Sequence, residues 1–95
     1  DQSLQQYPLR GTLTIASSGK VTLAITSADV RPNGQDAAVF MLYDVTTGQK
    51  LAAATRGADG FYGQGTADPD VYDLLIVPVD AQGYEDRTQA ISIQR

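Results

Sequence analysis

Short runs of alternating apolar and polar residues fill most of the chain, and each run is closed by a Gly, Pro, Asp or Asn. In the clearest run, Val21, Leu23 and Ile25 alternate with polar residues. A period of two residues puts successive side chains on opposite faces, which predicts a β-strand with one buried face. The pattern predicts seven strands along the chain, at residues 9–15, 20–26, 37–45, 50–56, 61–66, 71–79 and 88–94.

Two of these segments, residues 37–45 and 71–79, are apolar at consecutive rather than alternate positions. Continuous apolar runs of strand length are expected for central strands with both faces buried. Pro78 has no backbone N–H to give to a strand ladder, so it marks a strand end or an edge. The three alanines of residues 50–56 also suit a helix, but flanking glycines limit that segment to seven residues, which favours a strand.

The connections between the strands carry turn residues. The turn at residues 17–19 is so short that the first two strands are expected to form an antiparallel hairpin. Residues 27–36 form the longest polar connection. Pro32 presets φ within it, while Asn33 and Gly34 tolerate positive φ, so the sequence predicts a tight turn there.

Seven short strands spaced about 8–12 residues apart are typical of a β-sandwich. The sequence therefore predicts an all-β fold, a single antiparallel seven-stranded Greek-key β-sandwich of immunoglobulin-like or transthyretin-like type, with a small closed barrel as the alternative. Residues 1–8 are polar and include Pro8, so we expect a flexible N-terminal arm ahead of a domain at residues 9–95. The predicted core consists of Leu13, Ile15, Val21, Leu23, Ile25, Phe40, Leu42, Leu51, Tyr72, Leu74, Ile76, Ile91 and Ile93.

Composition and charge narrow the range of partners. The 95 residues suffice for one domain, and the formal net charge is −4. An acidic chain without a basic stripe is poorly suited to bind phosphates, so nucleic acid is not an expected partner. No apolar run reaches the roughly 18–20 residues that span a bilayer, so membrane insertion is not expected. The many Thr, Ser, Gln and Asp residues favour an extracytoplasmic location, either secreted, at a cell surface or in a virion.

Residue types that carry catalysis are scarce. The chain has no His and no Cys, which leaves no ordinary Ser-His-Asp or Cys-His arrangement, no disulfide and no thiolate metal site. A pair of carboxylates can hydrolyse glycosides, but a β-domain of 95 residues rarely supplies the cleft that such a pair needs. We therefore expect neither enzymatic activity nor a cofactor.

Residues 68–74 (DPDVYDL) resemble the Asp-x-x-x-Tyr-x-Cys stretch of immunoglobulin-like domains, with Leu74 at the position of the Cys. In those domains the Tyr hydroxyl hydrogen-bonds back to the backbone at a strand corner. The resemblance implies that Tyr72 is a structural tyrosine corner, with an ordinary core tyrosine as the alternative.

A second resemblance covers residues 37–93 and rests on the segments AVFMLYD (38–44), TG (47–48), ADGFY (58–62), YDL (72–74), GY (83–84) and ISI (91–93). Their order resembles that of the carboxypeptidase-regulatory-like and transthyretin-like β-sandwich modules. Those modules normally have a Gly before the Tyr strand, where this chain has Asp70 and Val71. The resemblance implies a non-catalytic accessory or surface module, usually in an exported protein.

Acidic residues gather in the second half of the chain, and three of them are candidate calcium ligands. Calcium takes several oxygen ligands at about 2.3–2.6 Å, which the loop carboxylates of Asp80, Glu85 and Asp86 can supply. We predict solvated turn carboxylates and no metal site here, and calcium binding by these three residues is the alternative interpretation. Asp68 and Asp70 lie before the predicted strand at residues 71–79, and the three candidates lie after it. At about 3.3 Å per residue this strand separates the two groups by roughly 30 Å, so Asp68 and Asp70 cannot join that site.

Exposed aromatic and arm residues are the candidates for binding. Tyr62 and Tyr84 fall at loops or edges, where their rings can bind a protein or stack on a sugar; packing at the rim of the core is the alternative. In the arm, Gln5, Gln6 and Tyr7 can contact a neighbour by adding a strand to its sheet edge.

Two functions follow from these observations. The first is a non-enzymatic structural subunit of an extracellular or virion assembly, which contacts protein, including copies of itself, through sheet edges and the N-terminal arm. The alternative is an accessory protein- or carbohydrate-binding β-sandwich module of an exported protein.

Overall fold

The structure is a computed structural model that describes residues 2–5 and 8–95. Its strands are β1 (Gln2–Leu4), β2 (Leu9–Ile15), β3 (Lys20–Ala28), β4 (Val39–Asp44), β5 (Lys50–Arg56), β6 (Phe61–Thr66), β7 (Asp73–Val79) and β8 (Ile91–Gln94). Two short 3-10 turns are η1 (Pro32–Gly34) and η2 (Arg87–Gln89). Across these described ranges the chain forms no α-helix, and so no helix long and apolar enough to cross a membrane.

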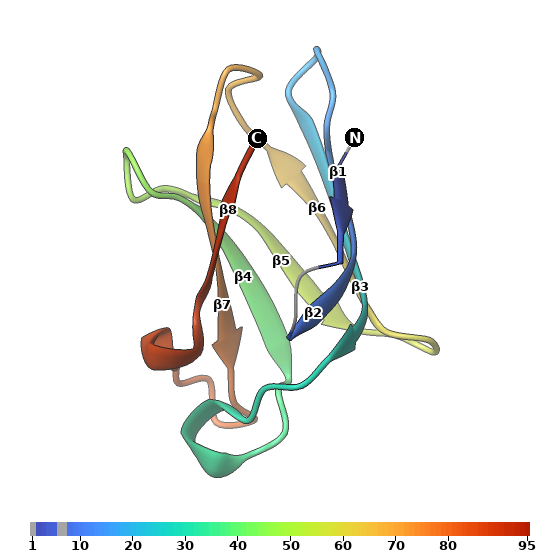
Figure 1. The fold of residues 1–95 in the computed structure, drawn as a ribbon, viewed down its shortest axis with the longest axis vertical. Coiled ribbons are helices and arrows are strands. Elements are labelled where there is room, and N and C mark those ends of the chain that lie inside the picture. The colour runs from blue at the N-terminus through green and yellow to red at the C-terminus, as the bar shows by residue number, and fades with distance from the viewer. Residues whose placement is uncertain (1, 6–7) are drawn as a thin grey trace.

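All eight strands belong to one antiparallel sheet, in the order β1-β2-β3-β6-β5-β4-β7-β8. The sheet is strongly curled, with β7 and β8 on one side, β1 to β3 on the other, and β4, β5 and β6 running between them (Figure 1). The all-β prediction is confirmed. The predicted seven-stranded Greek-key β-sandwich is wrong, because β6 pairs with both β3 and β5 and so unites strands that a sandwich would divide between two sheets.

The curled sheet is a half-barrel with two edges. β1 and β8 lie at opposite ends of the strand order, so no hydrogen-bonded ladder joins them. The alternative of a small closed barrel therefore does not fit the structure either. The line along which a barrel would have closed is open, and it forms the candidate site described below.

The first strand, β1, was not predicted. It lies within the expected arm at residues 1–8 and pairs with β2, with Leu4 opposite Gly11. The Leu4 side chain is buried in the core, which accounts for the docking of so short a strand. A single Leu among glutamines gives no alternation long enough to reveal a strand. The mobility of residues 1–8 as an arm stays a prediction.

Two glycines of β6 allow the sheet to curl sharply. A Cβ atom on Gly63 would lie 2.1 Å from the carbonyl oxygen of Ala53, and one on Gly65 would lie 1.7 Å from that of Leu51. Both contacts are far too short for real atoms, so only glycine lets β5 pass this close to β6. β6 consequently lies at a bend inside the sheet, between β3 and β5.

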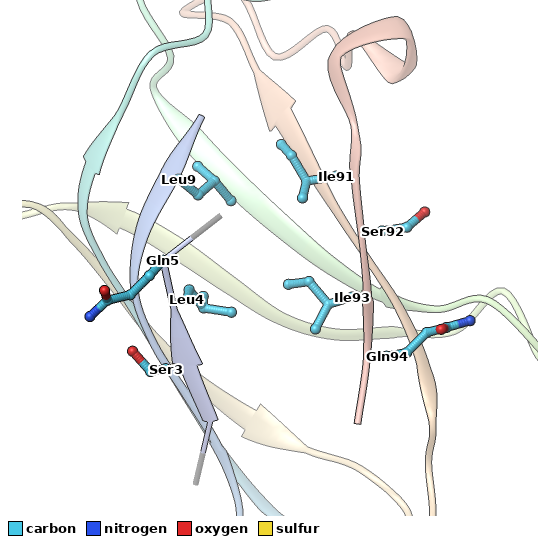
Figure 2. Close-up of a pocket in the computed structure, with 8 residues that line it drawn as sticks. All are labelled: Ser3, Leu4, Gln5, Leu9, Ile91, Ser92, Ile93 and Gln94. Atoms are coloured by element: carbon cyan, nitrogen blue, oxygen red, sulfur yellow. The ribbon is translucent and has the colours of Figure 1, made fainter. Parts of the chain in front are cut away.

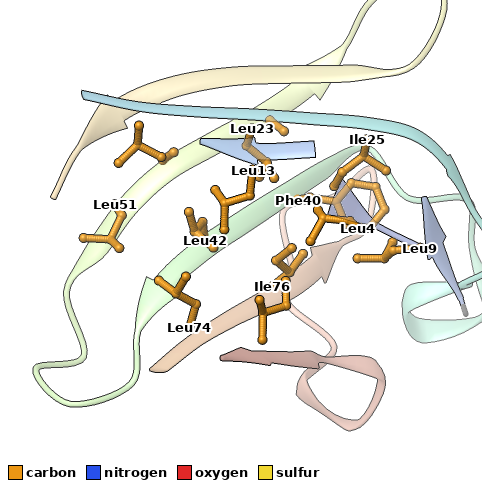
Figure 3. Close-up of a cluster of buried hydrophobic side chains, with 14 of the residues drawn as sticks. Leu4, Leu9, Leu13, Leu23, Ile25, Phe40, Leu42, Leu51, Leu74 and Ile76 are labelled. Carbon is orange, nitrogen blue, oxygen red and sulfur yellow. The ribbon is translucent and has the colours of Figure 1, made fainter. Parts of the chain in front are cut away.

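The hydrophobic core fills the inside of the curl (Figure 3). At its centre the rings of Phe40 and Phe61 meet edge to face, with centroids 4.8 Å apart. Every residue predicted for the core is buried except Tyr72. Burying each large apolar side chain stabilises the fold by about 1.5–3 kcal/mol, so this cluster is the main source of stability.

Tyr72 is 55% exposed, so its prediction as a core residue or tyrosine corner is wrong. The inward alternation of Leu74 and Ile76 belongs to β7, which begins only at Asp73. Tyr72 lies before that strand, where Val71 is the buried residue. Residues 68–74 therefore match the spacing of an immunoglobulin-like tyrosine corner, but Tyr72 does not lie within a strand as the tyrosine of such a corner does.

Candidate functional site

The open line between β1 and β8 is a groove of about 430 Å³. We call it the seam. The side chains of Leu4 and Leu9 face those of Ile91 and Ile93 across it (Figure 2). The described residues that line it are Ser3, Leu4, Gln5, Leu9, Ile91, Ser92, Ile93 and Gln94.

Among the described residues, none that lines the seam is charged, although the chain carries 7 basic and 11 acidic residues. Natural proteins usually protect a sheet edge with charged side chains, proline or a bulge, because a bare edge can pair with another chain. Neither Gln2–Leu4 nor Ile91–Gln94 contains a charged residue or a proline. The two edge strands therefore lack protecting charges and prolines, although their shortness, three and four residues, limits the length of any pairing.

The backbone of β8 offers hydrogen-bonding groups to the seam. The N–H of Arg95 donates to the carbonyl oxygen of Tyr72 at 3.1 Å, on the β7 side. Because alternate residues of an antiparallel strand point their N–H and C=O groups to opposite sides, those of Ser92 point away from β7. The Ser92 side chain is exposed, while Ile91 and Ile93 are buried in the core.

A second cluster of side chains lies after the C-terminal end of β7. Its hydrogen bonds join the loop that follows β7 to the η1 turn. The carboxylate of Asp80 accepts hydrogen bonds from the backbone N–H groups of Gln82 and Tyr84, both at 2.9 Å, through Oδ1. Its Oδ2 accepts from Nδ2 of Asn33, also at 2.9 Å. The Asp80 residue is only 3% exposed, so this contact is largely shielded from solvent.

The side chain of Asp86 binds the backbone of the same residue, Asn33. Oδ2 of Asp86 accepts from the Asn33 N–H and from Nε2 of Gln89, each at 2.9 Å. Gln89 in turn binds the backbone of Arg31 through both of its side-chain atoms, at 2.9 and 2.7 Å. We call Asn33, Asp80, Asp86 and Gln89 the loop clamp, because they join the η1 turn to the loop that follows β7.

These hydrogen bonds favour the charged form of both carboxylates. The Tyr84 N–H, with help from Asn33 and Gln82, lowers the pKa of Asp80 below its usual value. The Asn33 N–H, with help from Thr88 and Gln89, does the same for the pKa of Asp86. Both groups are therefore ionised at neutral pH.

The third calcium candidate, Glu85, is bound to different partners. It accepts hydrogen bonds from the Tyr43 hydroxyl and from Nε of Arg87, the latter at 3.1 Å. The Arg87 guanidinium also lies 4.8 Å from the centre of the Tyr43 ring. The hydrogen bond to Glu85, together with partial burial, raises the pKa of Tyr43 above its usual value.

All six oxygens of Asp80, Glu85 and Asp86 thus accept hydrogen bonds from protein donors. In the part of the chain that the structure describes, no three acidic residues come together in a way that could hold a metal ion. The three carboxylates are held by hydrogen bonds to the protein, and Asp80, which is 3% exposed, is not the solvated turn carboxylate that the sequence predicts. Asp68 and Asp70 precede β7, whereas Asp80, Glu85 and Asp86 follow it.

The predicted binding residues lie in separate places. Tyr62 is 46% exposed, on β6 beside the turn at residues 57–60, and Tyr84 is 69% exposed, in the loop after β7. Gln5 lines the seam. Gln6 and Tyr7 lie outside the described residues. The seam itself was missed by sequence reasoning, because its Leu4, Leu9 and isoleucines come from the two ends of the chain.

Comparison of the chain with family models, with curated proteins and with solved structures found no match in any of the three. The resemblance to carboxypeptidase-regulatory-like and transthyretin-like modules stays a prediction. The seam, the loop clamp and the exposed tyrosines are the features of the molecule that bear on its function.

Proposed function

We propose that the chain is a non-enzymatic structural subunit of an extracellular or virion assembly, and that β8 pairs with β8 of a second copy at the seam. The observation that carries this proposal is the edge strand β8, which contains no charged residue and lies beside an open groove. The strand β1, from the predicted arm, forms the opposite wall of that groove and gives the incoming strand a second edge to contact.

The sequence of β8 suits pairing with itself. Residues 91–93 read Ile-Ser-Ile in either direction, so an antiparallel pair centred on Ser92 is symmetric. In this register the outward N–H and C=O of Ser92 exchange two hydrogen bonds with those of its counterpart. Each Ile91 then lies opposite an Ile93 on the inner face, where apolar cross-strand pairs stabilise a sheet.

Electrostatics permits such an association. Each copy has a formal net charge of −4, but none of the described residues that line the seam is charged. Repulsion between distant surface charges is screened beyond about 8 Å at physiological ionic strength. A four-residue edge makes a small interface, so we expect weak association that depends on concentration.

The non-enzymatic part of the proposal is supported by the state of the carboxylates. Asp80 and Asp86 have lowered pKa values and carry several hydrogen bonds each. A general acid or base instead needs a pKa near the working pH and a free approach to substrate. Their contacts to loop backbone fit a structural role.

Charge-swap variants at Ser92 test the proposed pairing. In the symmetric register the two substituted side chains lie directly opposite each other, where like charges repel and opposite charges attract. Ser92→Lys alone and Ser92→Glu alone should stay monomeric in light scattering over a hundredfold concentration range. An equimolar mixture of the two should associate at least as well as the unchanged chain.

Ser17→Lys is the matched control, because it makes the same charge change in the exposed turn between β2 and β3. It should associate like the unchanged chain. The proposal is wrong if the unchanged chain stays monomeric throughout the range, or if Ser92→Lys associates as well as Ser17→Lys does.

The second candidate function, an accessory protein- or carbohydrate-binding module, is favoured by Tyr84. Its ring is 69% exposed, yet its backbone N–H and carbonyl oxygen are both held by Asp80, at 2.9 and 3.0 Å. Because the backbone of Tyr84 is already held, less chain entropy is lost when its exposed side chain binds a partner. Glycan-array binding that is lost in Tyr84→Ala and kept in Tyr62→Ala would support this function at the loop; binding kept in both variants would contradict it.

A further inference from the structure

We propose that Asn33 is a self-modification site, at which the side-chain amide is lost through attack by the backbone of Gly34, and that the loop clamp controls the rate. Asn33 is the single asparagine of the chain and is followed directly by glycine. This inference does not depend on the proposed assembly.

The reaction needs only the chain and water. The Gly34 nitrogen attacks Cγ of Asn33, the bond from Cγ to Nδ2 breaks, and ammonia leaves with the proton of the Gly34 N–H. A five-membered succinimide forms. Water then opens it at one of its two carbonyls, which leaves either aspartate or isoaspartate at position 33. Gly34 has no side chain to hinder the approach of its nitrogen, and it lies in exposed sequence.

In the folded chain both reacting groups are engaged elsewhere. The Gly34 N–H donates to the carbonyl oxygen of Arg31 at 3.0 Å. The Asn33 amide donates to Oδ2 of Asp80 at 2.9 Å and to the carbonyl oxygen of Tyr84 at 3.3 Å. Attack therefore requires the η1 turn to leave the loop clamp. The rate then follows the fraction of molecules in which this turn is open.

The product cannot restore the clamp. The side chain of an aspartate at position 33 has no N–H to donate to Asp80, and it brings a third carboxylate beside Asp80 and Asp86, which are both ionised. Like charges at this distance repel, and isoaspartate also lengthens the backbone by one methylene group. The modification would act as a one-way release of the η1 turn from the loop that carries Tyr84.

Mass spectrometry of the native chain, incubated at mildly alkaline pH, tests both parts of the proposal. Trypsin resists cleavage before Pro32, so Asn33 falls in the peptide of residues 21–50, apart from position 80. Conversion appears there as the small mass gain from replacing NH2 with OH. The Asp80→Asn variant replaces the charged acceptor of the Asn33 amide with a neutral amide group. Because a charge-assisted hydrogen bond is lost, Asn33 in this variant should convert roughly tenfold faster than in the unchanged chain.

A second clamp variant and a matched control complete the test. Gln89→Ala removes clamp contacts from an exposed 3-10 turn without touching the core, so it should also accelerate conversion even if Asp80→Asn folds poorly. Asp68→Asn, at the opposite end of β7, is the matched control and should convert at the unchanged rate. Equal rates in Gln89→Ala and Asp68→Asn would refute control by the clamp. No conversion in the urea-unfolded chain would refute the site itself.

Discussion

At the residue scale, the most consequential position is Asn33. It has φ of 53°, in the left-handed region that asparagine tolerates better than most residues. That conformation presents its side-chain amide to Asp80 and its backbone N–H to Asp86. One residue with unusual backbone geometry thereby joins the η1 turn to two residues of the loop after β7, which are 47 and 53 positions away in the sequence. The turn chemistry of Pro32, Asn33 and Gly34 was readable from the sequence, but its distant partners were not.

The loop clamp should make the stability of the folded chain depend on pH. The native pKa values of Asp80 and Asp86 lie below the unfolded value of about 3.9, so the ionised forms stabilise the folded chain. This contribution is fully present above the unfolded pKa and is lost as the pH falls through the lower native values. At neutral pH, Asp80→Asn should lower the Tm by roughly 5–10 °C. In thermal unfolding followed by circular dichroism, that difference should shrink in acid.

Asp68→Asn is the control for this titration, since Asp68 lies in an exposed turn away from the clamp. Its Tm should track that of the unchanged chain at every pH. A Tm difference for Asp80→Asn that stays constant down to the acid limit would show that ionisation of Asp80 does not stabilise the clamp.

At the element scale, most strands could be predicted because their signals are local. The strands at residues 9–15, 50–56 and 61–66 match β2, β5 and β6, since alternation and flanking glycines define both ends. The last strand begins at Ile91, later than predicted, because η2 occupies residues 87–89. There the Asp86 side chain caps the turn by accepting the N–H of Thr88.

The pairing of the strands could not be predicted, because it depends on contacts between distant segments. Nothing local in β6 says that it pairs with both β3 and β5. Its two glycines indicated an irregularity, but the close approach of β5 carbonyl groups becomes evident only in the structure. The seam was hidden for the same reason, because its walls come from β1 and β8 at the two ends of the chain.

The glycines of β6 give a direct test of this bend. An added methyl group at Gly65 would meet the backbone of Leu51, which cannot move without shifting β5. Gly65→Ala should therefore destabilise the domain by about 3 kcal/mol or more, measured by urea unfolding. Gln64→Ala, on the exposed face of the same strand, should change the unfolding free energy by no more than about 0.5 kcal/mol. A Gly65→Ala variant as stable as Gln64→Ala would mean that β5 does not approach β6 as described.

At the scale of the whole molecule, the open half-barrel explains why a sheet edge becomes the candidate interface. A sandwich and a half-barrel can share the same strands, but only the half-barrel leaves its first and last strands facing each other across an open groove. Pairing at that groove adds backbone hydrogen bonds to an edge that lacks protecting charges. The assembly proposal therefore depends on the path of the whole sheet and not on any single motif.

Amide hydrogen exchange of β8, followed by NMR at low and high protein concentration, tests the pairing most directly. The Ser92 N–H points away from β7, so it should exchange quickly in dilute solution and become protected as the concentration rises. The Ile93 N–H points toward β7 and should be protected at both concentrations. If Ser92 exchanges equally fast at both concentrations, pairing between copies through β8 is contradicted.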